Sequence, residues 1–397
     1  MEKENFYLSP STEAEQALVL DDSQWQRLLS KTGGAAAVCY QCGSCSAVCP
    51  WGLVNDQIQT ARIVIRKAQL GVETAGEGLW LCTDCGQCEA ICPRDVPVAE
   101  VTRALRQIAW EDRLVPEGLS PVLWSLYWNN NPWSQPPSER STWASDLELP
   151  EFDSDQHDIL LYIGCTASYD PRLANIARAL VLLLRSAGAA FGVLGDEEPC
   201  CGDAALSLGH KDYFYDLAEK ATTLFNGRGV KRLVALSPHC YNVFINHYPR
   251  SFRQVLEVHH YTQFVSWLMD NGKISFKGSV PVAATYHDPC LLARTNPNSD
   301  SSRRILKAIP GLKLVEMERS GQSTLCCGGG GGRMWQETEA GQRFSDLRIE
   351  EAHSTGAELL VTACPYCLTC LEDSVKFNKT ISLEVLDLAE LCLKALA

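Results

Sequence analysis

The sequence predicts an α+β multidomain chain, in which a mostly helical N-terminal module precedes two pseudo-symmetric α/β units with parallel sheets. Three observations lead to this fold class. In the first 115 residues, apolar side chains recur at helical spacing around two groups of cysteines. From residue 156 onward, short apolar runs of strand length alternate with helical patterns, as in parallel, doubly wound sheets. The whole alternation then occurs a second time.

The composition is that of a globular protein with unusually many cysteines. The chain has 397 residues, enough for two or three domains, and 19 of them are cysteine. We see no signal peptide and no apolar run long enough to span a bilayer, so we expect a cytoplasmic protein that reaches a membrane only through a partner subunit. Cysteines in that compartment indicate metal or redox chemistry. The net charge of −13 argues against nucleic-acid binding.

The N-terminal module, residues 1–115, carries one cysteine motif twice. Each copy reads C-x2-C-x2-C-x3-C-P, the spacing of bacterial ferredoxins, in which the fourth cysteine binds the other cluster. The expected ligands of one [4Fe–4S] cluster are Cys39, Cys42, Cys45 and Cys92. Those of the second are Cys82, Cys85, Cys88 and Cys49. A pair of zinc sites would use separated C-x-x-C pairs without the trailing Cys-Pro.

Helices are expected on both sides of these motifs. We expect an amphipathic helix within residues 11–30, and further helices from the apolar residues at helical spacing between and after the motifs. Those residues are Ile58, Ala61, Ile65, Ala68, Val101, Leu105 and Ile108. Because helices rather than hairpins flank the cysteines, the module is similar to the α-helical ferredoxin modules of larger redox complexes, which conduct electrons.

A linker, residues 116–155, is rich in proline and tryptophan. Its prolines exclude a long helix, and its aromatic content is too high for a solvated linker. It is interpreted as a strap packed across the domain junction. The alternative is a docking surface for a partner subunit, since tryptophan and tyrosine anchor interfaces.

Residues 156–275 and 280–397 repeat one α/β pattern. In the first copy we expect strands at 158–163, 191–194 and 232–236, and helices at 173–186 and 213–225. In the second we expect strands at 282–286, 312–315 and 358–362, and helices at 302–309 and 343–353. Ligands of such sheets lie beyond the carboxyl ends of the strands, and each group of cysteines stands at such a position or beside it.

The cysteine spacings of the two copies agree. A single cysteine precedes a Cys-Cys-Gly triplet by 35 residues in the first copy and 36 in the second, and the last cysteine follows the pair by 39 and 40 residues. The first copy contains Cys165, Cys200, Cys201 and Cys240. The second contains Cys290, Cys326, Cys327, Cys364 and Cys367. We therefore expect the thiolates of the second copy to converge from three loops.

Together, the doubled cysteine-rich pattern and the two-cluster module resemble the D subunit of heterodisulfide reductase. They are also similar to the iron–sulfur subunits of glycolate oxidase and anaerobic glycerol-3-phosphate dehydrogenase. The resemblance runs from about residue 36 to the C-terminus. It implies that the complete second domain holds a noncubane [4Fe–4S] cluster as the catalytic centre, through five thiolates. These would be Cys290, Cys326, Cys327, Cys364 and Cys367.

The first copy departs from the family pattern, because Ser237 stands where the second copy has Cys364. Its four cysteines, with His239 as a possible substitute ligand, leave three possibilities open: a zinc ion, a smaller cluster, or a purely structural site. Cys370 and Cys392 are interpreted as buried thiols rather than ligands.

Other residues flank the second copy's cysteines. The glycine run 328–332 either lets backbone N–H groups approach the cluster sulfurs and leaves room for a substrate, or is a flexible turn. His287, Asp288 and Arg333 either move protons and hold an anionic substrate, or serve packing and capping.

Two functions fit these features. In the first, the chain is an electron-transfer subunit of a multi-subunit oxidoreductase, and its second-copy cluster reduces a disulfide, as the resemblance implies. In the second, it is only a wire between a flavoprotein dehydrogenase, acting on a 2-hydroxy acid, glycerol-3-phosphate or an acyl-CoA, and quinone. No G-x-G-x-x-G fingerprint follows a strand, so flavin would belong to a partner. We expect a flavoprotein or a membrane quinone-reactive subunit as partner.

Overall fold

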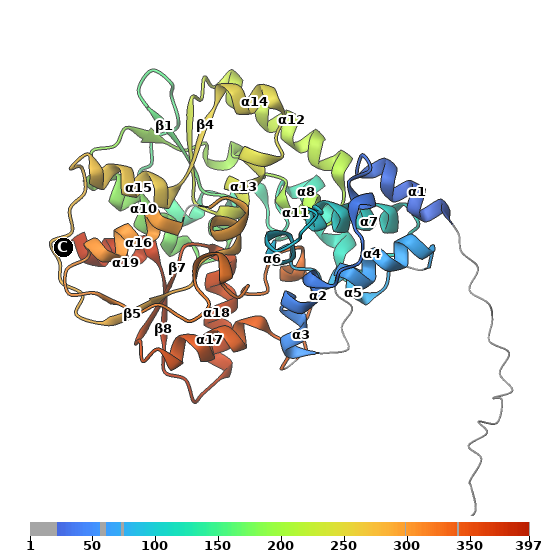
Figure 1. Cartoon of the computed structure of the whole chain (residues 1–397). Coiled ribbons are helices and arrows are strands. Elements are labelled where there is room, and N and C mark those ends of the chain that lie inside the picture. The colour runs from blue at the N-terminus through green and yellow to red at the C-terminus, as the bar shows by residue number, and fades with distance from the viewer. Residues whose placement is uncertain (1–21, 56–60, 73–74, 298, 340, 397) are drawn as a thin grey trace, which may run out of the picture.

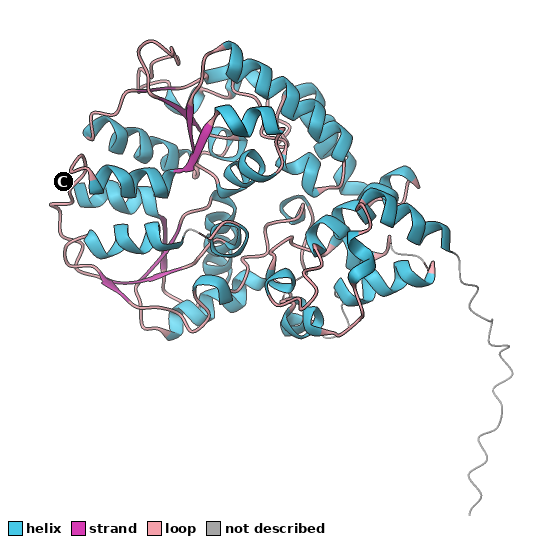
Figure 2. Cartoon of the chain, turned by 45° about the horizontal axis from the view of Figure 1, so that its top comes forward, coloured by secondary structure: helices cyan, strands magenta, loops and turns pink. Residues whose placement is uncertain are grey.

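The computed structural model describes residues 22–55, 61–72, 75–297, 299–339 and 341–396. Within them, a helical N-terminal part lies beside two α/β units, each built on a parallel four-stranded sheet (Figures 1 and 2). The predicted fold class is therefore confirmed.

Short helices hold the two ferredoxin-type motifs. Where the structure describes the chain before the proline-rich segment, it shows seven α-helices: α1 (Asp22–Lys31), α2 (Ser44–Val48), α3 (Trp51–Val54), α4 (Ala61–Leu70), α5 (Glu77–Trp80), α6 (Gln87–Ala90) and α7 (Val98–Glu111). Leu28 of α1, Ile65 of α4 and Leu105 of α7 share one buried core. Of the helix expected within residues 11–30, the part before Asp22 lies outside the described residues, as does Ile58.

The proline-rich segment forms one ten-residue helix, α8 (Ser120–Asn129), with Pro121 in its first turn, where a missing N–H costs nothing. Trp133 and Trp143 pack against the core of the α/β units, as expected of a strap. Trp124, Tyr127 and Trp128 of α8 are instead exposed. The strap interpretation thus fits Trp133 and Trp143, and the docking interpretation stays a prediction for the exposed residues of α8.

The first α/β unit has the strand order β2-β1-β3-β4, all parallel. Its strands are β1 (Ile159–Tyr162), β2 (Phe191–Gly192), β3 (Arg232–Ala235) and β4 (Glu257–His260). Its helices are α9 (Cys165–Tyr169), α10 (Ala174–Ser186), α11 (Asp203–Ser207), α12 (Lys211–Gly227), α13 (Pro238–Asn246), α14 (Arg250–Val255) and α15 (Tyr261–Asp270).

The second unit has the matching order β6-β5-β7-β8, again all parallel. Its strands are β5 (Ala283–Tyr286), β6 (Lys313–Leu314), β7 (Leu359–Thr362) and β8 (Glu384–Asp387). Its helices are α16 (Ser299–Ala308), α17 (Phe344–Ser354), α18 (Pro365–Phe377) and α19 (Leu388–Leu396). Each expected strand is present, but the sequence pattern does not predict β4 and β8, the last strand of each sheet.

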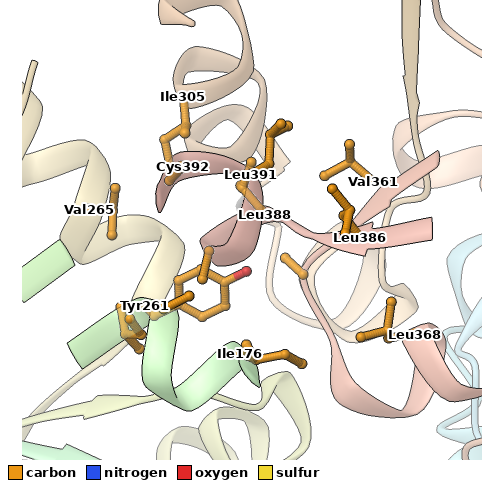
Figure 3. Close-up of a cluster of buried hydrophobic side chains, with 14 of the residues drawn as sticks. Ile176, Tyr261, Val265, Ile305, Val361, Leu368, Leu386, Leu388, Leu391 and Cys392 are labelled. Atoms are coloured by element: carbon orange, nitrogen blue, oxygen red, sulfur yellow. The ribbon is translucent and has the colours of Figure 1, made fainter. Parts of the chain in front are cut away.

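The two units share one hydrophobic core. Helix α10 packs on α19, and α15 packs on α16. The long helix that follows the first strand of each unit therefore packs on the helix that follows the last strand of the other unit. Figure 3 shows Tyr261 of the first unit between Ile176 of the same unit and Leu388 and Leu391 of the second. The Tyr261 hydroxyl donates a 2.6 Å hydrogen bond to the Asp387 carboxyl across this boundary. The repeats are therefore packed halves of one body.

Arg106 of α7 fastens the helical part to both α/β units. Its buried guanidinium donates to the carbonyl oxygens of Ser207 (2.7 Å), Gly331 (2.8 Å) and Cys82 (2.9 Å). These acceptors belong to the first unit, the second unit and the second ferredoxin motif. One side chain thus holds the three parts in a fixed arrangement.

Among the described residues, none of the helices is both long and apolar enough to cross a bilayer.

Candidate iron–sulfur centres

The second ferredoxin-type group surrounds one cavity. Cys82, Cys85, Cys88 and Cys49 line it, although Cys49 belongs to the other motif in sequence, and Cys45 of that motif also reaches the cavity. Burial and neighbouring thiolates raise the pKa of Cys49 to about 12, and burial raises that of Cys82 to about 11. Thiols that resist ionisation in this enclosure would be held as thiolates by a cationic iron cluster, so the four sulfurs fit a [4Fe–4S] group.

The first group lies nearer the surface. Burial and the charges of Cys39 and Cys42 raise the pKa of Cys45. Desolvation and the charges of Cys42 and Cys92 raise the pKa of Tyr40, which places Cys92 beside this group. Val96 N donates to the Cys92 sulfur at 3.4 Å, a contact suited to a cluster thiolate. This arrangement fits the crossed ligation expected from the sequence.

The five predicted ligands of the second α/β unit meet beyond the carboxyl ends of β5 and β7. Cys290 follows β5, Cys364 follows β7, and Cys367 lies in the first turn of α18. Hydrogen bonds join Cys326 to Cys290 and Cys327, and join Cys367 to Cys327 and Cys364. Because each sulfur contacts the next, the set can bind one compact group of irons.

His287 lies beside the cysteines of this site. Burial and the charges of Arg348 and Arg294 hold the pKa of His287 well below its usual range, so the ring is neutral. Its Nδ1 accepts a 3.0 Å hydrogen bond from Arg348 Nε, so the proton must lie on Nε2. That buried Nε2 has no hydrogen-bond partner among the described residues. His287 also lies with Cys327 and Cys367 in a group whose ligand atoms are within 4.8 Å of one another. A buried N–H on a ring beside these sulfurs fits a cluster sulfur as acceptor.

Asp288 and Arg333 have structural partners instead. Asp288 is buried and forms an ion pair with Arg303 at 2.6 Å. Arg333, also buried, donates to Gln336, the Glu337 carbonyl and Thr338 within its own loop. The ion pair of Asp288 agrees with the packing interpretation. Arg333 is held by neutral acceptors and also lines a cleft beside Cys327.

The cysteines of the second ferredoxin group touch those of the second α/β unit. A hydrogen bond joins the Cys85 and Cys326 thiols. Trp51, Leu81 and Phe344 pack around them, and the Trp51 and Phe344 rings lie 4.7 Å apart. The two cysteine groups are therefore adjacent, with a dry apolar wall beside the contact.

The glycine run makes this adjacency possible. A side chain at Gly330 or Gly331 would overlap the backbone carbonyls of Thr83 and Cys82 in the ferredoxin motif. Gly328 N donates to the Cys326 sulfur at 3.3 Å, as the first interpretation of the run expected. The glycines are thus required for a close approach of two backbones as well as for contact with the cysteine sulfurs.

A cleft of about 480 Å³ opens beside Cys327. Trp51, Arg343 and Cys370 are among its lining residues, and the Arg343 guanidinium lies over the Phe377 ring at 4.7 Å. The interpretation of Cys370 as a buried thiol is wrong in that respect, because Cys370 is only half-buried and faces the cleft; Cys392 is fully buried. The cleft gives a small molecule access to the cysteine site.

The first α/β unit also gathers its cysteines. Hydrogen bonds link Cys165 to Cys200, Cys200 to Cys201, and Cys201 to Cys240. Arg140 from the strap donates to the Cys165 sulfur at 3.6 Å and to Glu198 at 2.7 Å. All four thiols and this ion pair are buried.

Ser237 and His239, near the position of the missing cysteine, have other partners. Ser237 caps helix α13 by accepting a hydrogen bond from His239 N at 3.2 Å. The His239 ring contacts Asp203 at 3.2 Å and also Cys364 of the second unit. His239 therefore lies at the second unit's site and does not replace the missing cysteine of the first.

Comparison with known proteins agrees with this architecture. Residues 159–245 and 284–372 match the model of the cysteine-rich domain family, and residues 35–96 match the 4Fe-4S dicluster domain. The D subunit of the dihydromethanophenazine:CoB–CoM heterodisulfide reductase of Methanosarcina barkeri is 32% identical over 310 residues, which are 76% of this chain and 74% of that protein. The chain belongs to the heterodisulfide reductase D subunit family. As a member, it has a [4Fe–4S] dicluster domain followed by two cysteine-rich domains.

Two other relatives of this chain are longer proteins. The probable iron-sulfur-binding oxidoreductase FadF of Bacillus subtilis is 40% identical over 64% of this chain and 37% of that protein. The EtfAB:quinone oxidoreductase of Syntrophomonas wolfei is 38% identical over 68% of this chain and 39% of that protein. The chain thus spans less than half the length of these two relatives.

Proposed function

We propose that the chain is an iron–sulfur electron-transfer subunit of a multi-subunit oxidoreductase. Electrons pass through two [4Fe–4S] cubanes to a noncubane [4Fe–4S] cluster held by the second cysteine-rich domain, where a disulfide is reduced. The contact between Cys85 and Cys326 supports this order, because it puts a ligand of the second cubane against a ligand of the last cluster. The first cubane, bound by Cys39 and its partners, stands at the far end of the series.

The cleft supports a small-molecule substrate at the last centre. Reduction of a disulfide R–S–S–R′ breaks the sulfur–sulfur bond and consumes two electrons and two protons to give two thiols. Bound there, the cluster would supply electrons and an open iron for sulfur. The chain contributes an entrance beside Cys327, lined by Arg333 and Arg343 and also by Glu337 and Asp373. Arg343 offers a positive charge to a carboxylate of the disulfide. The buried His287 N–H is placed to stabilise negative charge on sulfur.

The alternative is a wire without substrate chemistry of its own. The relatives FadF and EtfAB:quinone oxidoreductase favour it, since the name of the second describes electron flow from an electron-transfer flavoprotein to quinone. In this function a flavoprotein dehydrogenase and a quinone-reactive subunit stand at the two ends, and the last cluster only passes electrons on.

Disulfide turnover separates the two functions. The holoprotein, reduced anaerobically, is mixed with glutathione disulfide or with uncharged hydroxyethyl disulfide, and the recovery of the visible absorbance of the oxidised clusters is followed together with thiol release. We expect two thiols per two electrons lost. Replacing Arg343 by Gln should slow the reaction with the anionic disulfide about ten-fold and leave the uncharged one nearly unchanged. Oxidised holoprotein should also show a new EPR signal on addition of thiol.

Cys392→Ala is the matched control, because that thiol is buried in α19 and away from the cleft. A holoprotein with full iron that neither releases thiols nor changes its EPR spectrum, but passes electrons to a quinone, would establish the wire.

A further inference from the structure

A groove of about 840 Å³ runs beside the first cubane's cysteines, at the opposite end of the cysteine series from the cleft. Helix α4 forms one wall and the Cys39 loop forms the other. Its floor is polar: Gln41 Nε2 donates to the Cys39 sulfur at 3.6 Å, and Gln69 donates to the Cys39 carbonyl at 3.4 Å. An object seated in the groove would therefore contact the loop that binds the first cubane.

The walls of this groove are basic. Arg62, Arg66 and Lys67 line it, and none has an ion-pair partner among the described residues. The nearby cations of α1 differ, because Arg27 and Lys31 are neutralised by Glu111 and Asp112 at 2.6–3.0 Å. Three cations without an ion pair in the described ranges lie on one helix, in contrast with the net charge of −13 for the chain. Such a local excess of positive charge attracts an acidic surface.

Exposed apolar side chains lie among these cations. Tyr40 is 60% exposed and Ile63 is 42% exposed, and both line the groove. Apolar side chains among charges of one sign suit a protein interface, where burial adds affinity and charge sets orientation and association rate. A small anion would use the charges but not the apolar side chains.

We propose that this groove, the α4 groove, is the port at which an acidic one-electron carrier protein docks and exchanges electrons with the first cubane. This inference rests on the proposed function and adds to it the kind of partner and its place. A second copy of the chain is disfavoured as occupant, since it would bring the same cations. One electron moves per encounter: the reduced carrier is oxidised and the first cubane is reduced, with no bond made or broken.

The test compares two double charge reversals. Arg66→Glu with Lys67→Glu changes the α4 groove, and Lys220→Glu with Lys231→Glu is the matched control, at exposed lysines of the first cysteine-rich domain without ion pairs among the described residues. Each lowers the net charge by the same amount. A plant-type [2Fe–2S] ferredoxin, which is acidic, is the carrier probe, and reduced methyl viologen is the small-molecule probe.

For the wild type, we expect the second-order rate constant of reduction by ferredoxin to fall as salt rises. The α4 groove variant should react at least about ten-fold more slowly at low salt and lose most of the salt dependence. The control variant should keep the salt dependence and most of the rate. Reduction by methyl viologen should be equally fast in all three proteins, which shows intact clusters.

Equal ferredoxin rates in the wild type and the groove variant would overturn the docking proposal. So would groove-dependent binding to vesicles of anionic lipid without any effect on ferredoxin reduction, which would assign the groove to a membrane surface. The proposed function fails separately, if viologen reduces the ferredoxin-type clusters but no electrons reach a third cluster.

Discussion

Arg106 is the residue on which the arrangement of the three parts depends most. Its guanidinium contacts the Cys82, Ser207 and Gly331 carbonyls, and it is buried. In the sequence it is one polar residue within the apolar stripe of Val101, Leu105 and Ile108, and the stripe alone does not reveal its partners.

Replacing Arg106 by Met should destabilise the protein by about 3 kcal/mol or more, because several buried carbonyls lose a charged donor. The holoprotein should unfold at a lower temperature, and electron transfer to the last cluster should slow, because the spacing of Cys85 and Cys326 relaxes. Arg178→Met, which removes an exposed pair with Asp146, is the control and should cost less than about 1 kcal/mol. An unchanged unfolding temperature for Arg106→Met would contradict this role.

Sequence spacing is sufficient to group the cysteines, since the structure brings each predicted set together. It does not find the residues that surround them. Arg140 and Glu198 form a buried pair at Cys165 although they are 58 residues apart in sequence, and the tautomer of His287 depends on Arg348, which is 61 residues away. Such partners follow no local pattern, so only the folded chain identifies them.

At the scale of elements, the ends of β4 and β8 show how the two units differ. His260 ends β4, and burial lowers its pKa to about 3. Asp387 ends β8, and burial raises its pKa to about 8. Both side chains are therefore neutral at pH 7. The sequence pattern does not reveal these strands because each combines few apolar residues with a polar end, whereas β1, β3, β5 and β7 are largely apolar.

The raised pKa of Asp387 predicts a pH-dependent stability. The pKa of an aspartate in an unfolded chain is about 3.9. Above that pH the folded chain still binds the proton of Asp387 and the unfolded chain does not, so protonation favours the folded state. The contribution of Asp387 to the free energy of unfolding is therefore complete below pH about 4. It falls by at most about 1.4 kcal/mol per pH unit as the pH rises, and it is lost as the pH passes about 8.

We expect the unfolding temperature of the wild type to fall relative to that of Asp387→Asn as the pH rises from 5 to 8, and the difference to level off above. The amide can keep the 2.6 Å hydrogen bond from Tyr261. Parallel curves for the two proteins across this range would show that Asp387 does not titrate as the structure indicates.

At the scale of the whole molecule, the pseudo-symmetric pair of α/β units was predictable and their shared core was not. Hydrophobic periodicity predicts the helices at α10 and α16, but not that they pack against α19 and α15 of the other repeat. For the same reason, no pattern shows that the glycine run meets the backbone of Cys82 and Thr83. These contacts bring the second cysteine-rich domain against the ferredoxin-type cysteines.

Iron content tests the central claim, that a third cluster in the second cysteine-rich domain ends the series. Anaerobically purified wild type should contain about 12 irons per chain and show three clusters by EPR on reductive titration. Cys326→Ser should lose about 4 irons and the third signal, and keep both cubanes. The equivalent change in the first domain, Cys200→Ser, should keep all three. About 8 irons in the wild type, with no third signal, would contradict the claim. So would a third signal that Cys200→Ser loses and Cys326→Ser keeps.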